Sequence, residues 1–394
     1  MKKKMFGLLP LLLVMTLTSC GEKELSGVAR AAAAKGAIDA YTNGTVVLPA
    51  NKSFGAEIDL NSEIEGTATL KTTKTNTDST KTTDETSATI KNSLSLNAKA
   101  AAILSGENQS ITLYGKGKDA GSVSITASEG KAEYAFSGEA ETKNEISDNL
   151  YSSTSLKSSY SVNENKSSFE GDKLFYSKTT SMTLINNFLN KFFGTESLAD
   201  LEKLPAITIT DEQKEDLIED FSGITDSTAY SIKLLQDGNN TKFSFDINNS
   251  YLLSLNGTNI AVSDNEILEG MTDIIGNVGD LIGSTSSDLA SLVPTFTKDS
   301  KISFYATLGA DYLPVKAGID LDLGNVSFAY KTEENSYDYL VLAATEGNFS
   351  FKALKLDLKV ELSYGDKVKK ACDLTDSEKK NILEKGTALG NQVL

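Results

Sequence analysis

The feature that most constrains the fold is a strict alternation of apolar and other side chains in two long runs. Apolar residues occupy every second position of residues 313–323 and 354–364, and polar residues fill most of the positions between them. Successive side chains of a strand point to opposite faces, so each run forms a strand with one apolar and one charged face. The run 354–364 has eleven residues and would span roughly 36 Å, about twice an ordinary strand. The pattern predicts long antiparallel strands whose apolar face must be covered.

Shorter alternating runs indicate further strands between about Thr45 and Thr180. Residues 67–90 are rich in Thr and Lys, and we interpret them as a solvated hairpin or a flexible loop. We interpret five glycines in this region as turns: Gly115, Gly117, Gly121, Gly130 and Gly138.

Helical spacing replaces this alternation in five segments. They are an Ala-rich helix over 25–40, with a stripe of Leu25, Val28, Ala29, Ala32 and Ala33, and helices near 182–193, 210–223, 264–282 and 375–389. Capping boxes mark three of the starts, with the pairs Thr210/Gln213, Ser263/Glu266 and Thr375/Glu378. Strands are expected between them at 230–235, 243–247 and 251–262.

These elements predict an α+β fold, a long curved antiparallel sheet that is half-open and barrel-like, with amphipathic helices packed on its concave face. If the helices fill that face incompletely, an apolar cavity remains. The glycines inside helix 264–282 fit either close packing on the sheet or a mobile lid over an apolar ligand. The residues expected to line the cavity, or otherwise to form plain core, are Ile267, Met271, Ile274, Val278, Leu321, Leu323, Leu356, Leu358 and Val360.

The N-terminus is typical of an export signal. Lys2 to Lys4 precede an apolar stretch over 6–17, which is too short for a spanning helix, and the segment ends in Leu17-Thr18-Ser19-Cys20. This ending resembles the lipobox of bacterial lipoproteins. The resemblance implies cleavage between Ser19 and Cys20, diacylglycerol on the Cys20 sulfur, and an extracytoplasmic protein anchored by lipid to the cell membrane. The alternative is an ordinary secretory signal in which Cys20 stands by chance.

On this basis the chain divides into a signal peptide (1–19), a lipidated tether with the Ala-rich helix (20–44) and a β-rich body (45–394). If the body forms two subdomains, the helical stretch 182–223 is their natural boundary.

Composition excludes several kinds of function. The chain has no His and a net charge of −16, and Arg30 is its one arginine. Catalysis that needs His is therefore excluded, and nucleic acid is not expected as a partner. Cys372 is the one cysteine besides Cys20, and we interpret it as an inert small apolar residue. No metal site or cofactor is expected.

The run Phe169-Glu170-Gly171-Asp172-Lys173-Leu174-Phe175-Tyr176, followed by a helical insert, resembles a passage in lipid-carrier lipoproteins of the LolA/LppX kind. The resemblance implies a curved, half-open antiparallel barrel that is closed by helices and holds acyl chains. We therefore expect a non-catalytic, membrane-anchored protein that binds or carries a lipid or another apolar ligand.

Other classes of function remain open. The main alternative is a surface-exposed structural or adhesion lipoprotein without a small-molecule ligand. An enzyme that uses carboxylates or a Ser-Lys dyad needs no His, but no recognisable constellation of such residues occurs. A solute-binding lipoprotein would need βαβ alternation, and a transmembrane β-barrel would not carry soluble-type helices between its strands.

Overall fold

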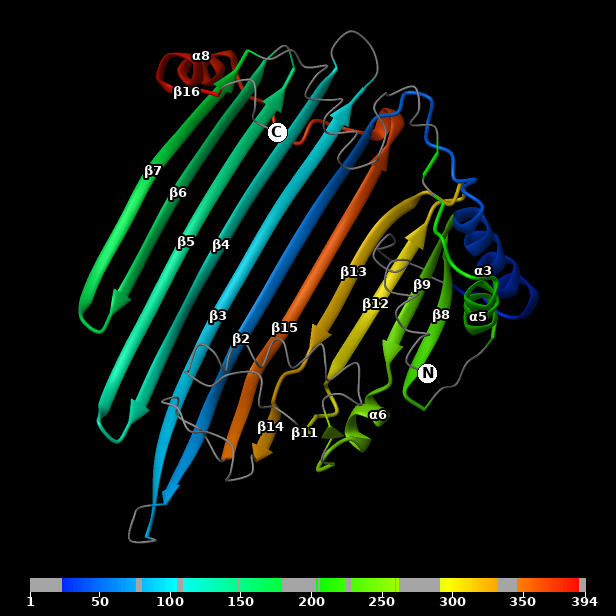
Figure 1. Cartoon of the computed structure of the whole chain (residues 1–394). Helices are drawn as coiled ribbons and strands as arrows, with labels where there is room; N and C mark the ends of the chain where they lie inside the picture. Colours follow the sequence, from blue (N-terminus) through cyan, green and yellow to red (C-terminus); the bar gives the residue numbers. More distant parts are fainter. Residues whose placement is uncertain are drawn as a thin grey trace.

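The architecture is a single sheet of very long strands, seen in a computed structural model. The structure describes residues 23–75, 80–104, 109–147, 149–178, 203–204, 206–223, 228–258, 260–261, 291–331 and 346–389. Within these ranges, 16 strands join in one long, curved, open sheet (Figure 1). Neighbouring strands are antiparallel, except that β16 runs parallel to β7. The expected long, curved, half-open antiparallel sheet is confirmed.

The strands are β1 (Lys23–Glu24), β2 (Phe54–Thr75), β3 (Lys81–Ile103), β4 (Ser110–Ala127), β5 (Gly130–Ile146), β6 (Leu150–Val162), β7 (Asn165–Ser177), β8 (Tyr230–Asp237), β9 (Asn240–Ile247), β10 (Ile260–Ala261), β11 (Ser291–Thr295), β12 (Lys301–Leu308), β13 (Pro314–Asp322), β14 (Val326–Lys331), β15 (Glu346–Tyr364) and β16 (Thr387–Ala388). The helices are α3 (Gly27–Thr42), α5 (Asp211–Ser222), α6 (Asn249–Ser254), the 3-10 turn η4 (Gly365–Lys367) and α8 (Asp376–Lys385). The strand order is β1-β8-β9-β12-β13-β15-β2-β3-β4-β5-β6-β7-β16, and β10, β11 and β14 attach beside β15.

The centre of the sheet is a ladder of exceptional length. β2 has 22 residues and β3 has 23, and they pair from Phe54 opposite Ala102 to Thr75 opposite Lys81. The Thr-rich residues 67–90 therefore form a hairpin, in agreement with the first of their two interpretations. Thr is β-branched and suits a strand, so the polarity of this segment does not prevent pairing.

Four of the five glycines that were interpreted as turns lie inside strands. Gly115, Gly117 and Gly121 belong to β4, and Gly138 belongs to β5. Gly130 does follow a turn, with a φ of 146°. The prediction was wrong because a glycine inside a long strand looks in sequence like a glycine that ends a short one.

The Ala-rich helix exists, but its buried face differs from the expected stripe. α3 buries Ala34, Ala37, Ile38 and Tyr41, whereas Val28 is 88% exposed. The prediction that Val28 belongs to the buried stripe was wrong. Alanines occur on every side of this helix, so hydrophobic periodicity does not indicate which side is buried. α3 packs beside α5 and the edge strand β8 (Figure 1).

The side chain of Arg30 joins these three elements. It is 1% exposed, and it donates hydrogen bonds from Nε to the Phe221 carbonyl and from a terminal nitrogen to the Ile232 carbonyl, both at 2.8 Å. Glu24 of β1 lies 3.9 Å from the guanidinium. The chain's one arginine therefore connects α3 to the end of α5 and to β8.

The capping predictions for two helices are confirmed. Thr210 and Gln213 form a capping box at the start of α5, and Thr375 and Glu378 form one at the start of α8. Hydrogen bonds from Thr375 hold the pKa of the Glu378 carboxyl below its ordinary value. Such caps satisfy backbone N–H groups that have no partner within the helix.

The third strand expected at 251–262 is wrong over most of its length. Residues 249–254 form α6, and only Ile260–Ala261 pair as β10. Asn249 fixes this helix, since its amide donates to the Thr297 and Ser300 carbonyls at 3.0 and 2.9 Å. Leu252 of the same helix is fully buried. Consecutive apolar residues suit a buried helix turn as well as a strand, and tertiary contacts decide between the two.

The expected covering of the concave face by helices is not confirmed. α3 and α5 pack at β8 and β9, and α8 packs through Ile382 against Tyr151 and Tyr176, on the opposite face of the sheet. The predicted helices 182–193 and 264–282 lie outside the described residues. No helix among the described residues is long and apolar enough to cross a bilayer.

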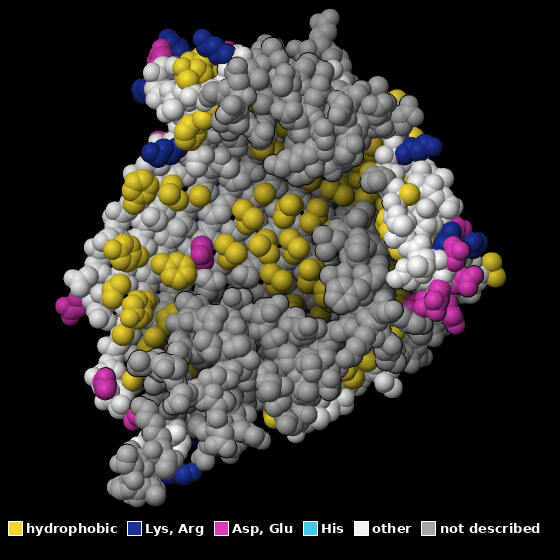
Figure 2. All heavy atoms as spheres, in the orientation of Figure 1, with side chains coloured by type: hydrophobic (Ala, Val, Ile, Leu, Met, Phe, Trp, Pro, Cys, Tyr) yellow, Lys and Arg dark blue, Asp and Glu magenta, His cyan; other side chains and the backbone are white. Residues whose placement is uncertain are grey.

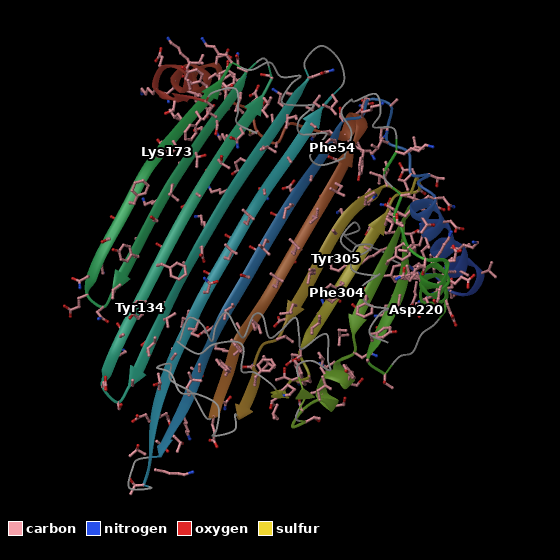
Figure 3. The ribbon with its side chains drawn as sticks, in the orientation of Figure 1. Phe54, Tyr134, Lys173, Asp220, Phe304 and Tyr305 are labelled. Atoms are coloured by element: carbon pink, nitrogen blue, oxygen red, sulfur yellow. The ribbon has the colours of Figure 1, made fainter. Side chains whose placement is uncertain are left out.

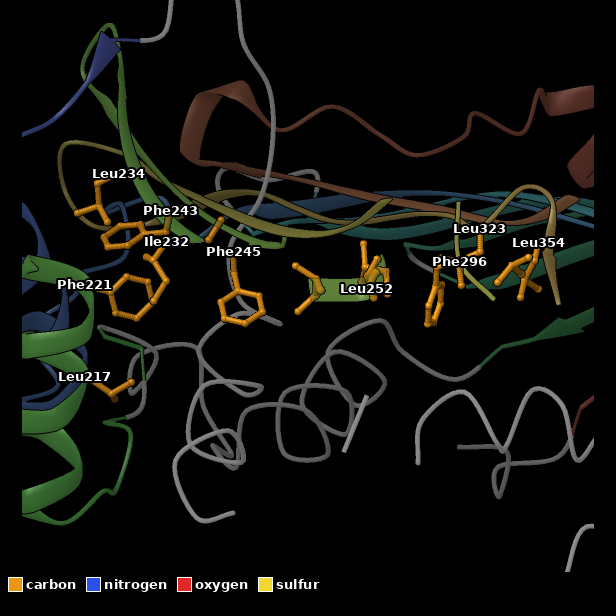
Figure 4. Packing of buried hydrophobic residues seen from close by; sticks show 14 of the residues in the cluster. Leu217, Phe221, Ile232, Leu234, Phe243, Phe245, Leu252, Phe296, Leu323 and Leu354 are labelled. Carbon is orange, nitrogen blue, oxygen red and sulfur yellow. The ribbon is translucent and has the colours of Figure 1, made fainter. Parts of the chain in front are cut away.

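The core lies on one face of the sheet. Figure 4 shows buried side chains from β8, β9, α6 and β15 on the same side as Leu217 and Phe221 of α5. The rings of Phe221 and Phe243 meet edge to face at 5.4 Å.

Replacing Arg30 by Met should lower the free energy of unfolding by about 3 kcal/mol, because two buried carbonyls lose charged donors. Urea unfolding followed by circular dichroism measures this. Lys35→Met is the matched control, since Lys35 is 63% exposed on the same helix. Equal midpoints for the two variants would contradict the connecting role of Arg30.

Candidate functional site

One face of the sheet is apolar from β8 to β7, and we call it the apolar face. Because side chains alternate along each strand, the pairing register places successive apolar residues in rows across the strands. One row runs from Phe245 through Phe304, Ile319 and Leu358 to Leu60 and Leu96. The opposite face carries Lys, Asp and Glu, and we call it the charged face.

The charged face is held by ion pairs between neighbouring strands. Lys99 meets Glu57 across β3 and β2, and Lys116 lies 3.1 Å from Glu141 across β4 and β5. The Lys116 ammonium holds the pKa of the Glu141 carboxyl below its ordinary value. Paired charges are well solvated, so this face needs no cover.

The structure brings together the described members of the predicted cavity lining. Leu321 pairs with Leu356 across β13 and β15, and Leu358 and Val360 follow on the same face. These four side chains are partly buried, whereas Leu323 is fully buried in the packed core. The helical members of the predicted lining (Ile267, Met271, Ile274 and Val278), together with Ser19 and Cys20, lie outside the described residues.

The apolar face becomes progressively more exposed from β8 toward β7. Leu234 on β8 is 0% exposed, Leu96 on β3 is 36% exposed, and Tyr160 on β6 is 58% exposed. The large exposed residues of this face form what we call the apolar strip: Leu96, Tyr134, Phe136, Leu156, Tyr160, Val162 and Phe169. Hydrophobic side chains cover the middle of this face and continue to its left-hand side in Figure 2. In Figure 3, Tyr134 of β5 lies well apart from Phe304 of β12, which is near the packed core.

Glycines form the floor of the strip. Four glycines lie at positions where a side chain would point toward the apolar face: Gly115, Gly117, Gly121 and Gly138. A Cβ at Gly138 would meet no atom within 4 Å, whereas one at Gly121 would lie 2.7 Å from the Phe136 ring. Phe136 therefore lies across Gly121, and Gly138 leaves open space beside it.

Few charges interrupt this surface. On the apolar face of β2 to β7, the charged side chains that the structure describes are Asp84, Asp119 and Lys173. Asn92 donates a hydrogen bond of 2.8 Å to Asp119, and Asp119 lies opposite Gly138. A polar pair therefore adjoins the strip.

The strip is not evident in the sequence, because its residues lie outside the longest apolar runs. Tyr160 and Phe169 are isolated aromatics among Ser, Thr and Lys, which individually resemble ordinary surface residues. What identifies them is their position in the alternation of side chains along each strand. Once the strands are paired, both residues lie on the same face as the glycines of β4 and β5.

Comparisons with known proteins give no family for this chain. No protein-family model and no curated protein matches it. A β-barrel-like protein of a domain of unknown function from Brucella abortus is 9% identical, covering 80% of this chain and 98% of its own, with a TM-score of 0.11. The outer membrane protease OmpT from Escherichia coli is 9% identical, covering 79% of this chain and 97% of its own, with a TM-score of 0.12. At these TM-scores neither likeness carries an argument.

The double variant Phe136→Ser/Phe169→Ser should bind much less bis-ANS than the parent chain, because such dyes report exposed apolar surface. Unfolding midpoints should change little, since both rings are exposed. The control is Val28→Ser/Leu383→Ser, which removes two exposed apolar residues elsewhere. Dye fluorescence that falls equally in both variants would argue against a continuous strip.

Proposed function

We propose that this protein binds or carries a lipid or another apolar ligand on the apolar face of its sheet, without chemical catalysis. The observation that supports the proposal is the apolar strip, in which seven large hydrophobic residues of β3, β5, β6 and β7 are at least 36% exposed. Exposed apolar patches of this kind mark binding surfaces more often than scattered single residues do.

The arrangement suits an extended hydrocarbon ligand. Such a chain fits over the glycine floor, where Gly138 leaves space, and contacts aromatic rings such as Phe136 and Tyr160, which pair across β5 and β6. Each CH₂ group removed from water contributes about 0.8 kcal/mol. A ligand with a polar head group would find the Asn92–Asp119 pair beside the strip.

The proposal includes the membrane anchor at Cys20. Lipid attached to that residue would hold the body near a bilayer, from which a lipid ligand can be taken or to which it can be returned. A protein with both features would move an apolar molecule over a short distance without diffusing away.

The ligand proposal is tested by comparing native with denaturing mass spectra of the full chain purified from membranes in detergent. We expect additional masses of lipid size that disappear on denaturation. Phe136→Ser/Phe169→Ser should reduce this occupancy about tenfold, since each aromatic contact contributes roughly 0.5–1.5 kcal/mol. The Val28→Ser/Leu383→Ser control should keep it. A bare chain in every preparation would leave the surface-adhesion alternative as the better explanation.

The anchor has a separate test. The denatured mass should correspond to a chain that begins at Cys20 and carries a covalent diacylglycerol. Cys20→Ala should retain the signal segment and move the protein out of the lipid-modified fraction in detergent phase separation. An unmodified cysteine in the wild-type chain would exclude the anchor while leaving the ligand proposal untouched.

A further inference from the structure

The C-terminal segment crosses the charged face near one end of the long strands. It leaves β15 through η4, whose Gly365 donates to the Ser53 carbonyl at 2.9 Å. Further along, the Ala371 N–H donates to Thr112 Oγ1 at 2.8 Å. The beginning of the segment is therefore held next to the start of β2, and its middle is held over β4.

Glu145 fixes the far end of this segment. It is 3% exposed, and it lies 2.8 Å from the Lys379 ammonium of α8 and 3.8 Å from that of Lys370. Its second oxygen accepts a hydrogen bond of 3.4 Å from the Leu374 N–H. A buried carboxylate with these partners keeps the segment in one position above the strands.

A cleft of about 740 Å³ lies between this segment and the sheet. Its floor is formed by the charged face, including Asn97 and Tyr114, and its wall is formed by residues 367 and 369–373. This volume falls within the range of small-molecule sites. The cleft is on the opposite face of the sheet from the apolar strip.

Most charges that line the cleft have partners. Lys99 pairs with Glu57, Lys143 pairs with Glu378, and Glu361 pairs with Lys316. Lys370 contacts both Asp373 and Glu145.

Lys367 and Lys369 differ from these residues. Both line the cleft and are exposed, and no carboxylate among the described residues pairs with either of them. In a chain whose net charge is −16, two lysines without counterions beside a cleft form a locally positive site.

We propose that this cleft binds a small anionic molecule whose phosphate or carboxylate group contacts Lys367 and Lys369. Asn97 and Tyr114 on the floor supply an amide and a hydroxyl for the polar remainder of the molecule. The site is independent of lipid binding, since the sheet separates the two surfaces.

Cys372 provides a reporter inside the cleft. It lines the site, and its Sγ lies 3.4 Å from the Leu113 carbonyl and 3.5 Å from that of Asn144. Burial raises the pKa of this thiol, which agrees with the expected inert character and makes its alkylation slow and measurable. The chain has two cysteines, so Cys20→Ser leaves Cys372 as its one thiol.

The experiment measures the rate of N-ethylmaleimide alkylation of Cys372 in the full chain carrying Cys20→Ser. Inorganic phosphate and citrate are titrated separately, with sodium chloride holding the ionic strength constant. We expect one or both anions to slow alkylation several-fold with saturation, and the more effective anion identifies the preferred head group. Lys367→Gln/Lys369→Gln should abolish the protection.

The matched control is Lys131→Gln/Lys298→Gln, which removes the same charge from two exposed positions outside the cleft and should retain the protection. Unfolding midpoints of both variants establish that they fold. Protection that is absent for both anions, or that persists unchanged in Lys367→Gln/Lys369→Gln, would overturn the proposal. Neither result bears on lipid occupancy of the apolar strip.

Discussion

The register between the long antiparallel strands is the constraint on which the rest of the structure depends. Side chains alternate between faces with a period of two, so a slip of one residue between β2 and β3 would exchange the apolar and charged faces. In β15 the alternation of apolar and charged side chains is maintained through a change of register. Phe349 and Phe351 occupy odd positions of its apolar face, whereas Leu354 and Leu356 occupy even ones. A bulge between Phe351 and Ala353 absorbs the change of phase, so the apolar face continues without interruption.

This separation of faces lets the two proposed sites coexist on the same strands. Thr112 and Tyr114 of β4 point toward the segment that crosses the charged face, while Leu113 between them points toward the apolar face. An apolar ligand and an anion would therefore be separated by a single layer of backbone. The buried charges that hold α8 in place, centred on Glu145, are likewise kept away from the hydrocarbon surface.

The sequence predicts those parts of the fold in which one local signal dominates. Alternation at 354–364 and the capping pair Thr375/Glu378 gave the correct strand and helix. Prediction failed where several arrangements satisfy the same pattern. Alanines around α3 hide which side meets β8, and the position of Arg30 is decided by the distant carbonyls of Phe221 and Ile232. The apolar strip depends on pairing between strands, and no single strand shows it. The cleft depends on the path of residues 365–375, which carries no periodic signal.

An open sheet must also protect its last strand. β7 has 13 residues, yet β16 pairs with it only at Phe175 and Tyr176. Among the residues that the structure describes, no other strand pairs with the rest of this edge, and open edges in other sheets promote association. β7 carries Lys166 and Lys173 on this exposed stretch, and Gly171 weakens its tendency to extend the ladder. Because lysine side chains must be desolvated when two edges meet, they oppose pairing between copies of the chain. The apolar strip can thus reach Phe169 near the edge while the strand beside it remains unsuited to adding another strand.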